Sequence, residues 1–384
     1  MLRNFGFGLL TLAIVAGFQA AATAQAPAKL RVYFGTYTSP NGSQGIYLSE
    51  LDLATGKLAE PVLAAEAVSP SFLAIHPTGK FVVAVNEISD LNGKKVGGVT
   101  SFAVDATTGK LTKLSQQPSG GPGPCHVAID GSGKFALAAN YGGGSCCVHP
   151  LGADGTLGEM TGFAQHEGSG GDPSRQKGPH AHSINMDAQN KFAFCADLGL
   201  DKILIYKLDH ATGKITPNDP PHVATPPAGG PRHFAFHPNG KFAYTCLEMT
   251  SSVSAMSYDA TKGSLAVLQT LSTLPAEHKG NSTAEIQVHP SGKFVYVSNR
   301  GHNSIAIFQV GDDGKLTAAG HQGEGVNVPR NFCVDPTGKF VVVANQAGND
   351  VVVFKVDQVT GKLEPTGNKI KVGSPVCVKF MAVK

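Results

Sequence analysis

Short runs of alternating apolar and polar residues, separated by turn sequences, recur along most of this chain. In the stretch 288–308, valines and isoleucines occupy every second position on either side of the loop 299–303. A period of two is typical of β-strands. The pattern predicts three strands, of which one ends at His289, one covers 294–298 and one covers 304–308. The same unit returns in both directions along the chain, so we interpret it as one copy of a repeat.

Two turn sequences mark the repeat. The first is His/Asp-Pro-x-Gly-Lys-Phe with two looser copies, 46 to 57 residues apart, and it starts at His76, Asp130, Asp187, His237, His289 and Asp335. In this context the histidines of the turns are expected to support the turns rather than to bind a ligand. The second turn sequence, Asp-x-x-x-Gly-Lys-Leu and its variants, occurs seven times, once more than the first.

The extra copy of the second turn is explained if a strand at the end of the chain belongs to the same blade as the first strands of the chain. Residues 374–380 repeat the pattern of residues 69–75, and the strands that this last unit lacks lie at 31–34 and 45–51. Seven four-stranded units of roughly 50 residues are typical of a propeller. We therefore predict an all-β, seven-bladed β-propeller whose C-terminal strand completes the first blade. A linear β-solenoid is the alternative, although its repeats are usually shorter.

The composition agrees with many short strands joined by tight turns. The chain has 384 residues with 41% hydrophobic and 15% charged residues, and it contains 47 glycines and 24 prolines. These proportions suit a globular protein of β type. The formal net charge is only +3 and the basic residues form no run, so nucleic acid is not expected as a partner.

The first 24 residues have the pattern of a secretion signal. Arg3 precedes an apolar segment at 7–18, and small residues end the segment at Ala22-Thr23-Ala24. We predict that residues 25–384 form one propeller domain, exported to the periplasm or secreted, with no membrane association after the signal is removed. An uncleaved anchor or a buried first strand is the alternative.

The seven cysteines show no CxxC pair and no closely spaced framework. Five lie inside predicted strands, and Cys146 and Cys147 are adjacent. Most are predicted to be small buried core residues. A disulfide is compatible with export, but the sequence selects no pair.

Polar residues gather at one end of the predicted blades. Each first-type turn joins two antiparallel strands. The first strand therefore begins next to the point where the second strand ends, on the face of the molecule opposite the turn. The residues at these positions that we expect to share a central cleft are His182, Arg232, Glu248, Glu285, Arg300 and Arg330. Mixed charges with an excess of arginine suit a small anionic molecule, because guanidinium groups grip carboxylate or phosphate. The loop 168–178 leads to the same face and is a candidate flexible lid.

Several stretches resemble the seven-bladed lactonase family, which includes propeller-type 6-phosphogluconolactonases and carboxymuconate-lactonising enzymes. The matching stretches are 139–145, 175–182, 230–238, 281–286 and 297–304. The resemblance covers nearly all of the predicted mature chain, and its most specific part is the Arg-Gln-x-Gly-Pro-His-Ala-His run. It implies a sugar lactone or a related cyclic ester as substrate.

The resemblance also implies which cleft residues act on the substrate. They are His180 or His182, Arg232, Glu248 and Arg300. In the fifth blade this chain has Leu247 before the glutamate, where the family more often has asparagine.

Lactone hydrolysis needs a base that activates water and donors that stabilise the oxyanion. We hypothesise that Glu248 or His182 is the base, and that Arg232 and Arg300 stabilise the oxyanion and bind the substrate anion. Burial raises the pKa of a glutamate and nearby arginines lower it, so the sequence leaves the base open. Further substrate contacts are expected from His180, Arg175, Glu285, Arg330, Asn299 and Tyr141.

No cofactor is expected. His180 and His182 offer two metal ligands, but no third acid or histidine follows at matching spacing, so a metal-independent lactonase is predicted. A muconate-type cycloisomerase and a non-catalytic exported binding or scaffold propeller are the alternatives. Because phosphorylated sugar lactones are cytosolic metabolites and export is predicted, the sequence leaves the exact lactone open, together with the oligomeric state.

Overall fold

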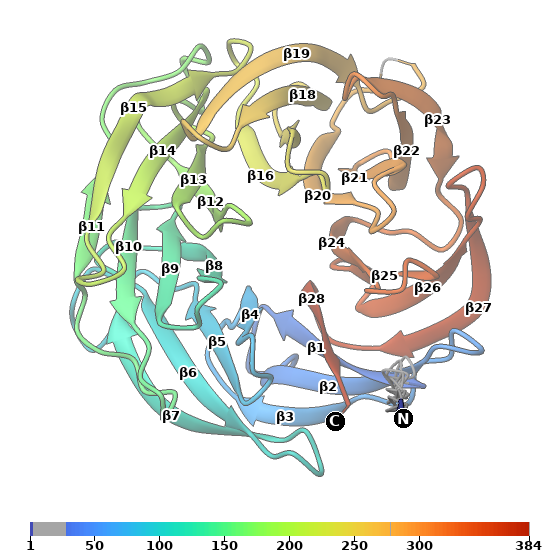
Figure 1. Cartoon of the computed structure of the whole chain (residues 1–384), viewed down its shortest axis with the longest axis horizontal. Coiled ribbons are helices and arrows are strands. Elements are labelled where there is room, and N and C mark those ends of the chain that lie inside the picture. Colours follow the sequence, from blue (N-terminus) through green and yellow to red (C-terminus); the bar gives the residue numbers. More distant parts are fainter. Residues whose placement is uncertain (3–27, 277, 384) are drawn as a thin grey trace.

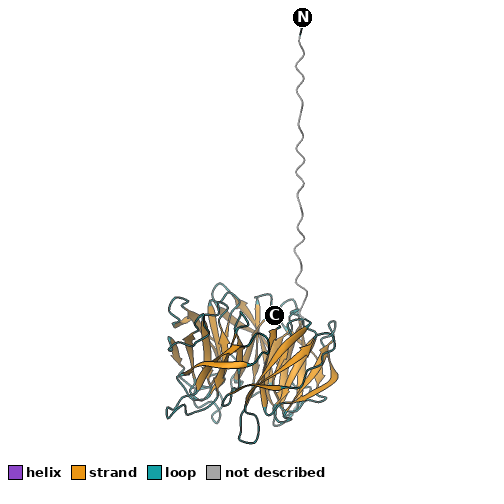
Figure 2. Ribbon diagram, turned by 90° about the horizontal axis from the view of Figure 1, so that it is seen from below, coloured by secondary structure: helices purple, strands orange, loops and turns teal. Residues whose placement is uncertain are grey.

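The fold is a ring of seven four-stranded antiparallel sheets around a central axis, as Figure 1 shows. This is a computed structural model, and it describes residues 1–2, 28–276 and 278–383. The ring is a short, broad body in the side view (Figure 2). The predicted propeller is confirmed. The predicted signal segment lies, apart from its first two residues, outside the described residues.

Each blade contributes its strands in order from the axis outward. Blade one contains β28 (Pro375–Ala382), β1 (Lys29–Thr36), β2 (Gly45–Asp52) and β3 (Val62–Glu66). Blade two contains β4 (Leu73–Ile75), β5 (Phe81–Asn86), β6 (Gly98–Val104) and β7 (Leu111–Pro118). Blade three contains β8 (Pro124–Ile129), β9 (Phe135–Asn140), β10 (Ser145–Pro150) and β11 (Gly162–Gln165). Blade four contains β12 (Ala181–Met186), β13 (Phe192–Asp197), β14 (Lys202–Leu208) and β15 (Ile215–Ala224).

The remaining three blades follow the same order. Blade five contains β16 (Pro231–Phe236), β17 (Phe242–Leu247), β18 (Ser252–Asp259) and β19 (Ser264–Ser272). Blade six contains β20 (Ser282–Val288), β21 (Phe294–Arg300), β22 (Ser304–Val310) and β23 (Leu316–Gln322). Blade seven contains β24 (Pro329–Val334), β25 (Phe340–Asn345), β26 (Asp350–Val356) and β27 (Leu363–Lys371). Among the described residues, none belongs to a helix long and apolar enough to cross a membrane.

The two ends of the chain close the ring, as the count of turns predicted. Strand β28 pairs antiparallel with β1, so that Phe380 lies opposite Val32 and Val378 lies opposite Phe34. The backbone N–H of Val378 also donates to the Asn331 side chain of blade seven at 2.8 Å. The last strand therefore joins the first blade to the seventh, and no sheet edge is left open at the seam.

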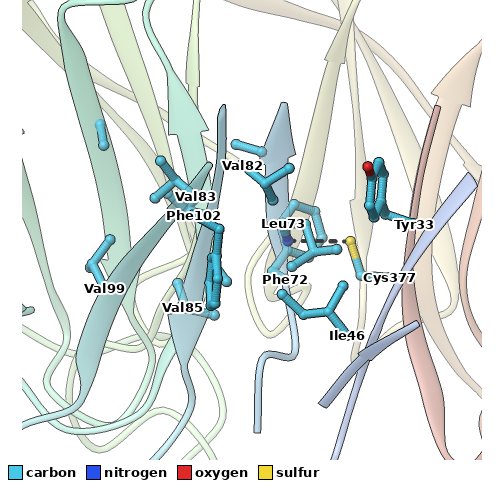
Figure 3. Close-up of a cluster of buried hydrophobic side chains, with 14 of the residues drawn as sticks. Tyr33, Ile46, Phe72, Leu73, Val82, Val83, Val85, Val99, Phe102 and Cys377 are labelled. Atoms are coloured by element: carbon cyan, nitrogen blue, oxygen red, sulfur yellow. Dashed lines mark hydrogen bonds between the residues drawn. The ribbon is translucent and has the colours of Figure 1, made fainter. Parts of the chain in front are cut away.

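Apolar side chains fill the interfaces between neighbouring blades. Figure 3 shows one such cluster, in which Ile46 and Cys377 of blade one face Leu73 and Phe102 of blade two. The dashed line marks the hydrogen bond from the Leu73 N–H to Cys377 Sγ. Each large side chain buried in this way contributes roughly 1.5–3 kcal/mol. These interfaces hold the strand ends, and so the site below, in fixed positions.

The histidines of the first-type turns lock each turn to the next blade. His76 Nε2 lies 3.0 Å from the Gly133 carbonyl oxygen, and His289 Nε2 lies 2.8 Å from that of Gly338. Both glycines have positive φ, and a Cβ at either would lie within 2.5 Å of the histidine ring. Glycine is therefore required there both by conformation and by close approach. The turn-supporting role predicted for these histidines is confirmed.

All seven cysteines are free, and six of them are buried. The sequence-based view of most of them as core residues is confirmed.

Candidate active site

The charged cleft lies at the face opposite the Gly-Lys turns, where inner strands begin and their neighbours end. Arg232 stands at the start of β16 and Glu248 directly follows the end of β17. Pro231 pairs with Leu247, so the antiparallel register places the arginine and the glutamate side by side. The repeat thus puts side chains 16 residues apart into contact.

Glu248 is the centre of the cleft. Its Oε2 lies 2.8 Å from Arg232 Nε and 3.0 Å from an Arg300 guanidinium nitrogen, and its Oε1 lies 3.2 Å from Arg175. Only 8% of Glu248 is exposed. Burial alone would raise its pKa, but the charges of Arg300, Arg232 and Arg330 lower the pKa of Glu248 to about 2. The carboxylate is therefore ionised at neutral pH and holds three guanidinium groups together.

Two of these arginines are fixed from behind by backbone carbonyls of β20. Arg232 Nη1 donates to the Ala284 carbonyl at 2.5 Å, and Arg300 Nη2 donates to the Thr283 carbonyl at 2.9 Å. Arg300 Nε is buried and has no hydrogen-bond partner within the described part of the chain. Burial, followed by the charge of Arg232, lowers the pKa of Arg300 to about 10, so it stays protonated. One donor of Arg300 is thus unused.

A cavity of about 210 Å³ opens beside this cluster. It is lined by Glu87, Cys125, Tyr141, His182, Glu248, Arg300 and Arg330. These residues come from blades two to seven, so the cavity lies at the axis where the inner strands converge. Its size suits a small molecule rather than a polymer.

His182, in β12, presents a neutral imidazole to the cavity. Its Nδ1 lies 3.6 Å from Cys125 Sγ, and its ring meets the Tyr141 ring edge-on at 5.3 Å. Burial, followed by the charge of Arg232, holds the pKa of His182 well below its usual 6.5. Near neutral pH the ring is therefore unprotonated, and it is a weaker base than a free imidazole.

Arg175, Tyr141 and His180 form the rim. The His180 ring stacks on Tyr141 at 4.6 Å, and His180 Nδ1 lies 3.0 Å from the Tyr141 carbonyl oxygen. The half-exposed Arg175 donates to the Tyr141 hydroxyl at 3.2 Å. The loop 168–178 that carries Arg175 is attached below by Gln176, which donates to Asp201 Oδ1 at 2.7 Å. The candidate lid is therefore anchored at its base, and Arg175 extends from it over the cleft.

Arg330 completes the positive side of the cavity. Its guanidinium lies 5.3 Å above the Tyr37 ring. The Tyr37 hydroxyl donates to Glu87 at 2.9 Å, and the Ser71 hydroxyl donates to the other Glu87 oxygen at 2.5 Å. Burial alone would lower the pKa of Arg330, but Tyr37 and Glu87 raise it, so the side chain is permanently charged.

Glu87 and Tyr37 were not selected as site residues from the sequence. Glu87 follows the second strand of blade two as Glu248 follows that of blade five, so its place in the repeat was a usable signal. Tyr37 follows β1, outside both turn sequences, and carried no such signal.

Two residues that the sequence predicts as substrate contacts have their polar groups hydrogen-bonded within the protein. Glu285 Oε2 lies 2.8 Å from His233 Nδ1 and also accepts from Asn331, while its Oε1 accepts from Gln287 at 2.9 Å. The fully buried Asn299 donates to the Thr273 carbonyl and accepts from the Thr273 hydroxyl. Their polar groups hold neighbouring strands and loops together, so we leave both residues out of the substrate contacts proposed below.

Comparison with known proteins gives a consistent result. The family model described as "Lactonase, 7-bladed beta-propeller" matches residues 31–380. A 6-phosphogluconolactonase of Bacillus subtilis is 39% identical over 351 residues, which cover 91% of this chain and 97% of that protein. The solved periplasmic gluconolactonase of Pseudomonas aeruginosa superposes with a TM-score of 0.87 at 32% identity, covering 93% of this chain and 100% of that one. A putative 6-phosphogluconolactonase from Bacteroides fragilis gives a TM-score of 0.85 at 36% identity, covering 92% and 98%.

Proposed function

The chain belongs to the lactonase family of seven-bladed β-propellers, and from this premise we propose that it hydrolyses an anionic sugar lactone in the cleft around Glu248. The observation that carries the proposal is the meeting of Arg175, Arg232 and Arg300 on one buried carboxylate. Such an array is expensive to bury unless it binds a charged ligand or stabilises a developing charge. The names of the relatives, 6-phosphogluconolactonase and gluconolactonase, support a lactone as substrate.

We assign the oxyanion to the arginines. When water attacks a lactone carbonyl, the carbonyl oxygen becomes negatively charged, and fixed donors that face it lower the barrier. Arg300 lines the cavity and is held in place by Glu248 and the Thr283 carbonyl. Arg232 lies beside it on the same carboxylate. Because both guanidinium groups are positioned before the substrate arrives, little reorganisation is needed.

We assign the base to His182. Glu248 is a weak base, since its pKa is about 2 and both its oxygens are paired with arginines. The neutral imidazole of His182 lines the same cavity. It takes a proton from the attacking water as the new C–O bond forms, and then gives that proton to the ring oxygen as the ester C–O bond breaks. The product is the open hydroxy acid, and the role of Glu248 is to hold the arginines.

The charge of the cleft favours an anionic substrate. Four arginines face two carboxylates there, and His182 is neutral. Two positive charges therefore remain for the substrate, which a phosphate or a carboxylate neutralises. Arg175 at the rim and Arg330 in the wall of the cavity are assigned to that anion, while Arg300, with Arg232 beside it, serves the reacting carbonyl.

We also propose that the protein is exported. The secretion pattern of residues 1–24 supports this, as does the periplasmic relative from Pseudomonas aeruginosa. An exported enzyme meets few sugar phosphates, so we favour a lactone whose negative charge is a carboxylate over a phosphorylated one. The proposed mechanism uses no metal ion or organic cofactor.

A substrate panel tests the proposal. The purified protein is assayed with a phosphorylated gluconolactone, with uncharged glucono- and galactonolactone, and with the lactone of a sugar diacid. We expect at least one charged lactone to be opened with kcat/KM of about 10⁴ M⁻¹s⁻¹ or more. Arg300→Ala should reduce this by at least ~100-fold. The proposal is wrong if no charged lactone opens faster than it does in buffer.

Adding carboxymuconate to the panel separates the alternatives. Ring closure of carboxymuconate with no lactone opening would indicate a cycloisomerase, for which paired arginines also suit the substrate carboxylates. Turnover of neither class would indicate a binding or scaffold propeller.

A further inference from the structure

A second cluster of chemically reactive side chains lies between blades three and four, outside the cleft. It consists of Cys146 in β10, His166 directly after β11, and Cys195 in β13. The two sulfur atoms and a nitrogen of the imidazole all lie within 4.8 Å of one another. Both cysteines are completely buried and His166 is 3% exposed. Three potential ligands thus converge from two blades on one point that water does not reach.

The orientation of His166 is the strongest indication of a ligand. Its Nδ1 lies 2.6 Å from Asp197 Oδ2, which fixes the ring and its tautomer. Its other ring nitrogen, Nε2, is buried beside the two sulfur atoms, and the Cys146 thiol is its close partner. A thiol is a weak hydrogen-bond partner for a buried imidazole nitrogen, so the arrangement needs an explanation. A carboxylate on one ring nitrogen and soft ligands facing the other is the arrangement that surrounds metal-binding histidines.

We propose that Cys146 Sγ, Cys195 Sγ and His166 Nε2 bind one thiophilic d¹⁰ cation, with Asp197 orienting the histidine. Thiolate and imidazole together select such ions, Cu(I) and Zn(II) being the common ones. Zn(II) ordinarily takes four ligands, whereas this buried site offers three and no access for water. The site therefore fits Cu(I) better than Zn(II). Binding deprotonates both thiols, and the two protons are released.

The bound cation would connect the strands and loops of blades three and four that carry the rim residues of the cleft. Cys146 follows the turn that begins with Tyr141, and His166 precedes the loop 168–178 that carries Arg175. Asp197 Oδ1 accepts from the backbone N–H of His180 at 2.8 Å. The bound ion would thus stiffen the rim from below. The proposal rests on this cluster alone and is independent of the reaction proposed above.

Metal content measured on matched variants tests the site. The full chain is expressed in medium supplied with copper or with zinc, purified under reducing, oxygen-free conditions, and analysed for metal by mass spectrometry. The variants are Cys146→Ala and Cys195→Ala, and the control is Cys147→Ala. Cys147 is the next residue and equally buried, but it packs in the cluster toward blades one and two rather than that toward blade four. Supplying the metal during synthesis removes any barrier to entry into a folded core.

We expect one cation per chain in the wild type and in Cys147→Ala, and less than about a tenth of that in the other two variants. More copper than zinc should be retained, and X-ray absorption should show two sulfur ligands and one nitrogen. Metal should raise the Tm of the wild type and of Cys147→Ala only. The site would be refuted by metal-free wild type, by equal losses in all three cysteine variants, or by a Cys146–Cys195 disulfide in the native protein.

Discussion

Arg232 and Glu248 face each other across one hairpin, with Arg232 Nε 2.8 Å from Glu248 Oε2. The arginine is only 1% exposed, so this is an ion pair inside the protein rather than on its surface. Arg300 shares the same oxygen at 3.0 Å. A single carboxylate thus holds two positively charged guanidinium groups close together. Their donors are arranged for a second anion, which we take to be the substrate.

Arg300→Lys should keep the positive charge but lose the several N–H donors of the planar guanidinium group. Because lysine cannot reach Glu248, the Thr283 carbonyl and a substrate oxygen at once, we expect kcat/KM for lactone hydrolysis to fall by ~100-fold or more. Lys293→Met is the control, since Lys293 belongs to the same blade but is exposed in the turn at the opposite face. Equal rates for Arg300→Lys and the wild type would contradict the assigned role.

Glu248→Gln should change the dependence of stability on pH. The pKa of Glu248 is lowered in the fold to about 2 from 4.5, so its contribution is fully present above pH 4.5 and is lost as pH falls toward 2. A shift of this size corresponds to ~3 kcal/mol. Denaturant unfolding at pH 6 should show Glu248→Gln less stable by about that amount, and the difference should shrink by pH 3.

Glu50→Gln provides the control for this measurement. Glu50 forms an exposed pair with Lys29, with 42% of the glutamate side chain accessible to solvent. Its loss should change stability by less than ~1 kcal/mol at either pH. A Glu248→Gln difference that is the same at pH 6 and pH 3 would show that the arginines do not set the pKa of this carboxyl.

The sequence predicted the parts of this molecule that depend on the repeat. The closure of β28 onto β1 follows from the count of turns, and the contact of Arg232 with Glu248 follows from antiparallel pairing beside a known turn. Both are consequences of local geometry copied around a ring. The same reasoning placed Arg300 and His182 at the axis.

The sequence did not predict interactions that depend on side-chain direction. Glu285 has the predicted place on its strand, but its carboxylate pairs with His233 and Asn331 of the inner strands on either side. The cluster of Cys146, His166 and Cys195 joins residues that occupy unrelated positions in their blades. No spacing in the chain predicts such a contact, because it joins two residues of blade three to one of blade four.

His182→Asn should remove the acidic limb of the pH–rate profile. Burial and the charge of Arg232 lower the pKa of His182, so its imidazole stays neutral until the pH falls well below 6.5. We expect kcat/KM of the wild type to stay level from pH 8 to below 6.5 and then to fall. The variant should lose ~100-fold or more in rate and show no such fall.

His180→Asn is the matched control for His182. His180 lies two residues away and stacks on Tyr141 at the rim. Its loss should reduce the rate without moving the limb. A wild-type limb at or above pH 6.5, or one that survives in His182→Asn, would exclude His182 as the base.

Tyr141→Phe should raise KM and leave kcat unchanged. The Tyr141 hydroxyl receives a hydrogen bond from Arg175 at 3.2 Å, which helps to hold that guanidinium over the cleft. Phenylalanine keeps the ring that stacks on His180 but releases Arg175, so binding of the substrate anion should weaken by ~3–10-fold, the effect of one hydrogen bond. Tyr33→Phe removes a hydroxyl that donates to the Gly109 carbonyl at 2.7 Å, between blades one and two. It should lower the Tm without changing KM. If both variants changed KM alike, the change would be a general structural effect and the role given to Arg175 would be wrong. If Tyr141→Phe lowered kcat instead, Arg175 would have to act on the reacting carbonyl rather than on the anion of the substrate.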